Sequence, residues 1–474
     1  MNRRDFIKSA LLGGIAMGAS IPLLRPRTSR AEPVPDYDKR VLVNLVLEGG
    51  PDFRHLLVPE FSSDKESFGY KYWTSRSRSH RIAASNDRME SRWNEYLRTE
   101  YAGTIFGIHP KAEWLKSYFD AGKVALVNNV LHSRTRDHAH SLLVLQSGDY
   151  NTGPHDLARD GWGGRLAKAC NGNVVSMTRN QLMFCNGPHP SNPKDHDNSM
   201  VISAGDTRNF ALYSDPKLAS EPGNTGTNAV LSRALRSYYQ AKRDLIAPSS
   251  PFYRFIRHEL TLRQLGDSIN TRLNSIAEPE TIKRLYENGQ YQLANSGFGK
   301  QLRNLFDSFV CGDILNFRVG SLNLGGWDSH KRQIDAIEPK IEDMFGKEKG
   351  FDTFLSELKK TLPQAYANAV FVIAGEFGRQ LAANGDEGTD HGRGNTMIIF
   401  GESVRGGLYG DLFPQTEIQR YAKPNTDIEG KTSFEHVFGS VCDWVQSDTG
   451  NLVFPARPDA IIEDGVNLGT LLTA

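Results

Sequence analysis

Histidines and carboxylates in this sequence cluster where hydrophobic segments end, so the fold itself could bring them together. Imidazole mixed with carboxylate is the ligand chemistry of zinc, manganese or iron, whereas calcium prefers oxygen ligands alone. Asp328 and His330 are two residues apart, so both side chains would leave one face of an extended segment and could bind one ion. The residues that follow predicted strands are Asp52, Asp137, His138, Asp328, His330 and Glu376, and Asp390 and His391 precede a further one.

Hydrophobic patterning predicts the elements that would position this set. Val41–Leu47 is a nearly continuous apolar run closed by Gly49-Gly50, as expected of a strand buried on both faces. Further strands are predicted at 124–130, 314–322, 370–374 and 396–400, and helices at 110–122, 300–310, 351–362 and 434–445. This alternation predicts an α/β fold with a mostly parallel sheet covered by helices on both faces. Ligands bind beyond the carboxyl ends of such strands, where the set would converge.

Two long polar segments interrupt the α/β pattern. Residues 60–101 include an arginine-rich run without apolar periodicity. Residues 150–296 are rich in Asn, Pro and Gly and contain an amphipathic stretch at 229–245. We interpret both as insertions in a single domain that spans residues 32–474, and the second as a helical and irregular elaboration over the sheet.

The amino terminus is typical of a twin-arginine signal peptide over residues 1–31. Arg3-Arg4 precede a weakly apolar stretch, and Ser29-Arg30-Ala31 fits a small-x-small cleavage site. A membrane anchor is the alternative, but residues 11–24 contain three glycines and a proline and fall short of the ~20 apolar residues of a span. The signal therefore predicts export by the twin-arginine translocase to the periplasm or beyond, with no stable membrane span.

The composition is that of an ordinary globular protein. With 39% hydrophobic and 23% charged residues among 474, the chain can bury a large core. A formal net charge of +1 gives no general argument for binding nucleic acid, and no such partner is expected. The four cysteines show no C-x-x-C spacing, which leaves the disulfide state open and disfavours a haem or iron–sulfur protein.

Three segments carry a resemblance to a known family. They are Gly325-Gly326-Trp327-Asp328-Ser329-His330-Lys331-Arg332-Gln333, Gly375-Glu376-Phe377-Gly378-Arg379 and Gly388-Thr389-Asp390-His391-Gly392. Behind a twin-arginine signal, they resemble the bacterial exported family known as domain of unknown function 1501, over most of the mature chain. That family is similar in turn to the alkaline phosphatase and sulfatase superfamily.

The resemblance implies an alkaline-phosphatase-like sheet that binds a divalent metal ion at its carboxyl edge. Asp52 would be the first-strand ligand, Asp328 and His330 the middle pair, and His391 the late histidine. Placement beside strand ends adds Glu376 and Asp390 to the candidate metal ligands. The identity of the ion, zinc, manganese or calcium, stays open.

The same resemblance implies a metal-dependent hydrolase of phosphate or sulfate esters, with a small-molecule or glycan ester as substrate. Either a metal-bound water attacks the ester, or Ser133, Thr135 or Asp137 does so covalently. Arg136 or Arg379 would bind the anionic group. His138, which follows Asp137 directly, completes the candidate catalytic set.

Departures from the family pattern favour a second hypothesis, a non-catalytic exported protein that keeps the fold and binds a glycan or a partner. The family's Arg-Ser-His-Phe stretch here is Arg136-Asp137-His138-Ala139, which removes a serine. Glu376-Phe377 stands where related hydrolases carry Asp-His. Simpler roles also stay open: Asp52 could cap a helix, His138 could bond to the backbone, and Glu376 could pair with an arginine.

Overall fold

The computed structural model describes residues 36–178, 181–192, 195–209, 234, 237–242, 245–247, 249–287, 297–462 and 466–473. The predicted signal peptide, residues 1–31, and much of the amphipathic stretch 229–245 lie outside the described residues. No described helix combines the length and the apolar composition that a membrane crossing requires. All four cysteines lie in the described part of the chain, buried and without a disulfide.

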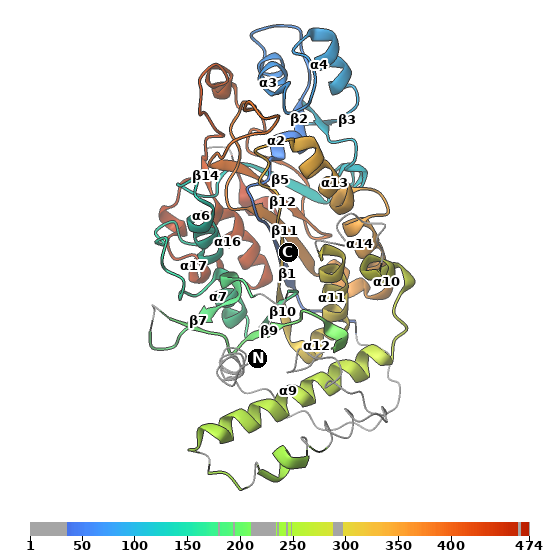
Figure 1. The fold of residues 1–474 in the computed structure, drawn as a ribbon, viewed down its shortest axis with the longest axis vertical. Coiled ribbons are helices and arrows are strands. Elements are labelled where there is room, and N and C mark those ends of the chain that lie inside the picture. Colours follow the sequence, from blue (N-terminus) through green and yellow to red (C-terminus); the bar gives the residue numbers. More distant parts are fainter. Residues whose placement is uncertain are drawn as a thin grey trace.

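A nine-stranded sheet forms the centre of the molecule (Figure 1). Its strands follow the order β13, β5, β12, β11, β1, β10, β6 and β9, and β14 also pairs with β5. Their bounds are β1 Val41–Leu47, β5 Val124–Leu131, β6 Asn173–Ser176, β9 Val201–Ser203, β10 Phe317–Leu324, β11 Ala369–Gly375, β12 Gly394–Phe400, β13 Gly407–Tyr409 and β14 Thr432–Ser433. Each strand predicted from the hydrophobic pattern corresponds to one of them.

The sheet is mixed but mostly parallel. β1 pairs in parallel with β10 and β11, β10 with β6, β6 with β9, and β5 with β13 and β14. Among the described strands of this sheet, β12 alone runs antiparallel to its neighbours, β11 and β5. The predicted α/β fold with a mostly parallel sheet is therefore confirmed, and the antiparallel strand is an addition to it.

Helices cover both faces of the sheet, because successive side chains of a buried strand point to opposite sides. Along β1, Val43 and Leu45 belong to one apolar core, and Leu42 and Val46 belong to the other. The first core is covered by α5 Glu113–Asp120, α11 Phe298–Val310, α13 Gln333–Phe345, α14 Gly350–Thr361 and α15 Pro363–Ala367. The second is covered by α6 His138–Ser147, α7 Trp162–Ala169, α16 Phe434–Val445 and α17 Gly450–Val453.

Two parts of the sheet differ from the sequence pattern. β10 begins at Phe317 rather than near residue 314, because α12, Gly312–Leu315, is a helical turn that Asn316 ends in the left-handed conformation, with φ 46°. β6 and β9 lie within residues 150–296, so this segment contributes two strands to the sheet. It also contains α9, Pro251–Asn274, and α10, Glu280–Glu287, and α9 crosses the lower end of the molecule in Figure 1.

Residues 60–101 belong to a small substructure at the opposite end of the molecule from α9 (Figure 1). It has its own three-stranded sheet in the order β2, β4, β3. Its elements are α2 Phe53–Leu56, β2 Leu57–Pro59, α3 Phe68–Arg76, α4 Asn86–Trp93, β3 Leu97–Tyr101 and β4 Thr104–Ile108. This substructure therefore begins directly after the carboxyl end of β1.

A buried ion pair attaches the substructure to the sheet. Nη1 of Arg76, at the end of α3, lies 2.6 Å from Oδ2 of Asp52, and both side chains are almost fully buried. The remaining guanidinium nitrogens of Arg76 donate to the carbonyls of Gln380 and Leu381. Burial raises the pKa of Asp52, but the charge and the hydrogen bond of Arg76 outweigh it and hold the pKa below its ordinary value. Asp52 is therefore an ionised carboxylate that depends on Arg76.

We expect Arg76→Met to lower the free energy of unfolding by about 3–5 kcal/mol, because it leaves the Asp52 charge buried without a partner. Arg81→Met is the matched control. Arg81 belongs to the same segment, but its ion pairs with Asp335 and Glu387 are open to solvent and contribute little. Urea unfolding of the two variants gives the comparison, and equal losses would show that Asp52 does not depend on Arg76.

Candidate metal centre

The strand ends meet at one edge of the sheet. In the register of the parallel strands, Leu47 of β1 is aligned with Leu324 of β10 and with Gly375 of β11. β12 runs in the opposite direction, so its first residue, Gly394, pairs with Leu131 at the end of β5. The loops after β1, β5, β10 and β11 and the loop before β12 therefore share this edge.

A close backbone approach holds two of these loops together. Gly49, after β1, has φ +117°, and a Cβ atom there would lie 2.3 Å from the backbone nitrogen of Asp328. Only glycine accepts both the conformation and the contact. The backbone N–H of Gly49 also donates to Oε1 of Glu376, at 2.8 Å. The Gly49-Gly50 turn thus sets the positions of both carboxylates.

Three imidazoles and one carboxylate converge in front of this turn. Nε2 of His330 and Nε2 of His391 lie 2.8 Å apart, and they lie 3.1 and 3.2 Å from Oδ1 of Asp328. Nε2 of His138 lies 3.5 Å from Oδ2 of Asp328. The ligand atoms of His138, Asp328 and His391 all lie within 4.8 Å of one another. Three imidazoles from three loops therefore surround the Asp328 carboxylate, His138 at Oδ2 and His330 and His391 at Oδ1.

The other ring nitrogen of each histidine faces an acceptor. Nδ1 of His391 lies 2.9 Å from the carbonyl oxygen of Arg136, which can only accept. Nδ1 of His138 lies 2.8 Å from Oε1 of Glu376, and Nδ1 of His330 lies 2.9 Å from Oδ1 of Asp390. Each Nδ1 thus carries the hydrogen, and Nε2 of each neutral ring presents a lone pair.

This tautomer pattern is the one that metal-binding histidines adopt. Two lone pairs facing each other across 2.8 Å, as in His330 and His391, repel unless a proton or a cation lies between them. Burial and the charge of Arg379 lower the pKa of His391, which disfavours a proton on that ring. Asp328 and His391, with His138 close to one carboxylate oxygen and His330 close to the other, therefore offer the donor types that a transition-metal ion prefers.

The local charges favour an ionised Asp328 and a positive charge on or beside the ring of His138. Burial raises the pKa of Asp328, but the hydrogen bond and the charge of Arg379 outweigh it and lower the pKa to about 2. Asp328 is thus ionised at neutral pH. The hydrogen bond to Glu376 raises the pKa of His138 above its ordinary value, because the carboxylate stabilises a positive ring. A metal ion bound at Nε2 would receive the same stabilisation from Glu376.

One side of the cluster is packed and the other is open. The ring of Phe377 lies 4.9 Å from that of His138 and 4.5 Å from that of His391, between ring centroids. The side chain of Glu376 is fully buried, whereas 42% of the Asp328 side chain is exposed. An ion held here would therefore be accessible to a ligand from solvent, as catalytic sites require.

Other residues of the predicted set lie outside this cluster. The carboxylate of Asp52 accepts hydrogen bonds from Arg76 and Gln333. The hydroxyl of Ser133 is buried and accepts from Ser141 and from the backbone of Thr135. Asp137 caps α6 by accepting from the backbone N–H of His140. Each of these three side chains is therefore engaged by a structural partner.

The two arginines of the predicted set are also engaged. Arg136 forms an ion pair with the buried Asp427, at 2.9 Å. Arg379 is fully buried and donates to the carbonyls of Gly49, Gly50, Trp327 and Thr389 as well as to Oδ1 of Asp328. Arg379 thus connects the loops that carry the candidate metal ligands through its hydrogen bonds.

Residues 254–423 match the family model described as "Protein of unknown function (DUF1501)". The matched segment contains Asp328, His330, Glu376, Asp390 and His391. His138 and the Gly49-Gly50 turn lie before it. The match supports the family resemblance over this part of the chain, and it assigns no activity. No curated protein matches the chain.

A second histidine–carboxylate group was not predicted from the sequence. Nε2 of His55 and Nε2 of His109 lie 3.3 and 3.2 Å from Oε1 of Glu338, in the buried contact between the small substructure and α13. His55 and His109 adjoin no strand of the central sheet, and Glu338 lies within a helix. The pattern that marked the first set therefore could not identify this group.

The second group fits a metal ion less well than the first. Nδ1 of His109 accepts from the backbone N–H of Lys111, at 3.2 Å, so Nε2 carries the hydrogen and has no lone pair. Arg92 already donates to Oε1 of Glu338, at 2.8 Å. Burial lowers the pKa of His109 to about 4, which keeps the ring neutral. We therefore interpret this group as a buried hydrogen-bond network around one carboxylate.

We expect the purified protein to bind one transition-metal ion, and His391→Ala to weaken its zinc affinity by at least about 10–100-fold, because the ring supplies one of four ligands. His155→Ala is the control, since this histidine is exposed and belongs to neither histidine–carboxylate group. Competition with a chromophoric chelator gives the affinities, and elemental analysis gives the stoichiometry. Equal affinities of the two variants would contradict the assignment.

Proposed function

We propose that the protein is an exported metal-dependent hydrolase of phosphate or sulfate esters. The observation that carries this proposal is the convergence of three imidazole Nε2 atoms on the Asp328 carboxylate, with every Nδ1 donating to a fixed acceptor. Mixed histidine and carboxylate ligands are typical of hydrolytic metal sites. The partial exposure of Asp328 leaves room for an ester beside the ion.

Some residues of the site would bind the ion, and others would orient the histidine rings that bind it. His138, Asp328, His330 and His391 would hold the ion, while Glu376 and Asp390 keep the rings of His138 and His330 in the binding tautomer. When bound, such an ion supplies a Lewis acid and lowers the pKa of a water molecule bound to it. The donor set favours zinc, manganese or iron over calcium, because three of four ligands are nitrogen.

The proposal includes the cellular location and the wider relationship of the fold. Residues 1–31 would direct export by the twin-arginine translocase to the periplasm or outside the cell. The α/β sheet with metal ligands at its carboxyl edge is the arrangement expected of an alkaline-phosphatase-like or sulfatase-like protein. A small-molecule or glycan ester remains the proposed substrate class.

A second candidate is a non-catalytic exported protein that keeps the ion for binding or stability. One observation favours it: the groups best suited to attack or bind an ester anion are engaged. The Ser133 hydroxyl is buried and hydrogen-bonded, and Arg136 forms an ion pair with Asp427. Arg379 donates its hydrogen bonds to backbone carbonyls and to Asp328. A hydrolase would then have to act without a serine nucleophile at this position.

We expect His330→Ala to lose bound metal and ester hydrolysis together while the fold persists, because His330 lies in a loop outside the apolar cores. Turnover of p-nitrophenyl phosphate and p-nitrophenyl sulfate should fall with metal occupancy, and chelation of the unmutated protein should have the same effect. His155→Ala is again the control. Metal binding by the unmutated protein without turnover of any ester would favour the second candidate, and hydrolysis insensitive to His330→Ala would place the chemistry elsewhere.

Export has its own test. We expect the double substitution Arg3→Lys and Arg4→Lys to retain the precursor in the cytoplasm, because the translocase recognises the arginine pair. Cell fractionation and immunoblotting of the full chain, with an Arg27→Lys variant as control, give the distribution. Undiminished export of the double variant would contradict the twin-arginine assignment.

A further inference from the structure

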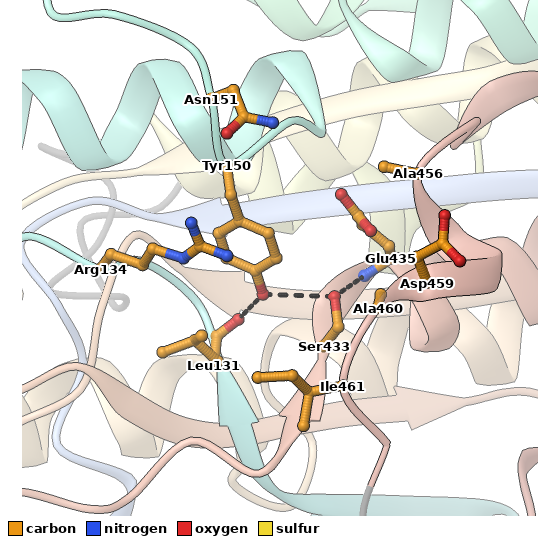
Figure 2. A pocket seen from close by; sticks show the side chains of 10 residues that line it. All are labelled: Leu131, Arg134, Tyr150, Asn151, Ser433, Glu435, Ala456, Asp459, Ala460 and Ile461. Atoms are coloured by element: carbon orange, nitrogen blue, oxygen red, sulfur yellow. Dashed lines mark hydrogen bonds between the residues drawn. The ribbon is translucent and has the colours of Figure 1, made fainter.

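A pocket of about 160 Å³ lies beside the ends of β5 and β14 (Figure 2). Its apolar lining comes from Leu131, Ala456, Ala460 and Ile461, and its charged lining comes from Arg134, Glu435 and Asp459. Because β14 runs parallel to β5, this pocket lies at the same edge of the sheet as the candidate metal centre. None of the four metal-ligand candidates lines it.

Glu435 is a buried carboxyl group of this pocket without a partner. It is only 2% exposed, and its carboxylate has no hydrogen-bond or ion-pair partner among the described residues. Figure 2 shows the carboxylates of Glu435 and Asp459 on one side of the pocket, with Tyr150 and Arg134 on the other. Burial and the charge of Asp149 raise the pKa of Glu435 to about 7, against the opposing charges of Arg134 and Arg165.

The pocket is otherwise rigidly built. The Tyr150 hydroxyl donates to the carbonyl of Leu131 and accepts from the backbone N–H of Phe434, at 3.2 Å. The guanidinium of Arg134 lies over the Tyr150 ring, 5.3 Å from its centroid, at the exposed rim. Tyr150 is therefore fixed, and Arg134 is stacked on its ring instead of pairing with Glu435.

The lining selects the charge and size of an occupant. A buried carboxylate without a partner is unfavourable, and an opposite charge with a hydrogen bond removes the penalty. An anion would be repelled by Glu435 and Asp459. Calcium requires six to eight oxygen ligands, and its competition with the organic ion is one outcome of the test below. A cavity of roughly 150 Å³ accommodates a molecule of about the size of benzene, so the occupant has about six non-hydrogen atoms.

We propose that this pocket binds a small organic ammonium ion. Its ammonium group donates to Glu435 at the base and is attracted by Asp459 at the rim, and its short carbon chain contacts Leu131 and Ile461. This site is independent of the metal centre and of the proposed hydrolysis, because no residue is common to the two.

The test compares n-butylammonium with n-butanol, which have the same number of non-hydrogen atoms and differ in charge. Isothermal titration calorimetry of the purified mature protein at pH 8 should detect binding of n-butylammonium, and n-butanol should bind at least about tenfold more weakly. Glu435→Gln should reduce n-butylammonium affinity by roughly tenfold or more, because it keeps the shape and removes the charge. Glu113→Gln, at an exposed first-turn position of α5, is the matched control and should leave affinity unchanged.

Circular dichroism of Glu435→Gln checks that the fold is intact, and Glu435→Asp provides a second variant that keeps the charge and should retain measurable binding. Three results would overturn the proposal: equal affinity for n-butylammonium and n-butanol, unchanged affinity in folded Glu435→Gln, or competition of calcium against n-butylammonium at lower concentration. Loss of metal by His391→Ala should not alter n-butylammonium binding, so failure of the metal assignment and failure of this one are distinguishable.

Discussion

The candidate centre depends on the hydrogen bonds that the guanidinium group of Arg379 donates. This group is fully buried, and its donors connect the turn after β1, the loop after β10 and the loop before β12 through the carbonyls of Gly49, Trp327 and Thr389. The same group supplies the positive charge that keeps Asp328 ionised. Buried carbonyls without donors are costly, so these loops hold one another in place only while Arg379 is present. The geometry of the ligands is therefore a property of the loop network rather than of any single strand.

The two histidine–carboxylate groups in this molecule differ in which ring nitrogen carries the hydrogen, and this determines whether Nε2 can offer a lone pair to a metal ion. In the open group, a carbonyl and two carboxylates accept from Nδ1, which leaves Nε2 lone pairs of His138, His330 and His391 directed inward. In the buried group, a backbone N–H donates to Nδ1 of His109 and forces the hydrogen onto Nε2. Residue types and nitrogen–oxygen distances are similar in the two groups, but the hydrogen-bond partners place the ring hydrogen on opposite nitrogens.

The sequence predicted the long strands of the central sheet and missed the short ones. The strands β1 and β11 and the helix α16 are long, buried and bounded by clear end signals. Their hydrophobic pattern was therefore sufficient to predict them. β6 and β9 have four and three residues within a polar segment, and such strands carry no pattern of their own. The candidate ligands were predicted because they adjoin strand ends, and the carboxyl ends of parallel strands share one edge of the sheet. The hydrogen-bond partners of the candidate ligands were harder to predict. The partner of His391 is the backbone carbonyl of Arg136, which no side chain reveals. Asn384, which donates to Asp390, lies six residues before it in the sequence.

The antiparallel direction of β12 explains why the cluster draws on residues on both sides of a strand. In a fully parallel sheet, ligands come from loops that follow strands, and residues that precede a strand lie at the far edge. Because β12 is reversed, the loop before it starts at the carboxyl edge, and Asp390 and His391 face Asp328 and His330. The reversal is possible because β12 follows β11 within the sheet and the connection, residues 376–393, stays on one edge. That single connection contributes five residues to the site. Glu376 and Asp390 accept hydrogen bonds from histidine rings, and Phe377 packs against two of these rings. Arg379 connects the loops, and His391 is a candidate ligand.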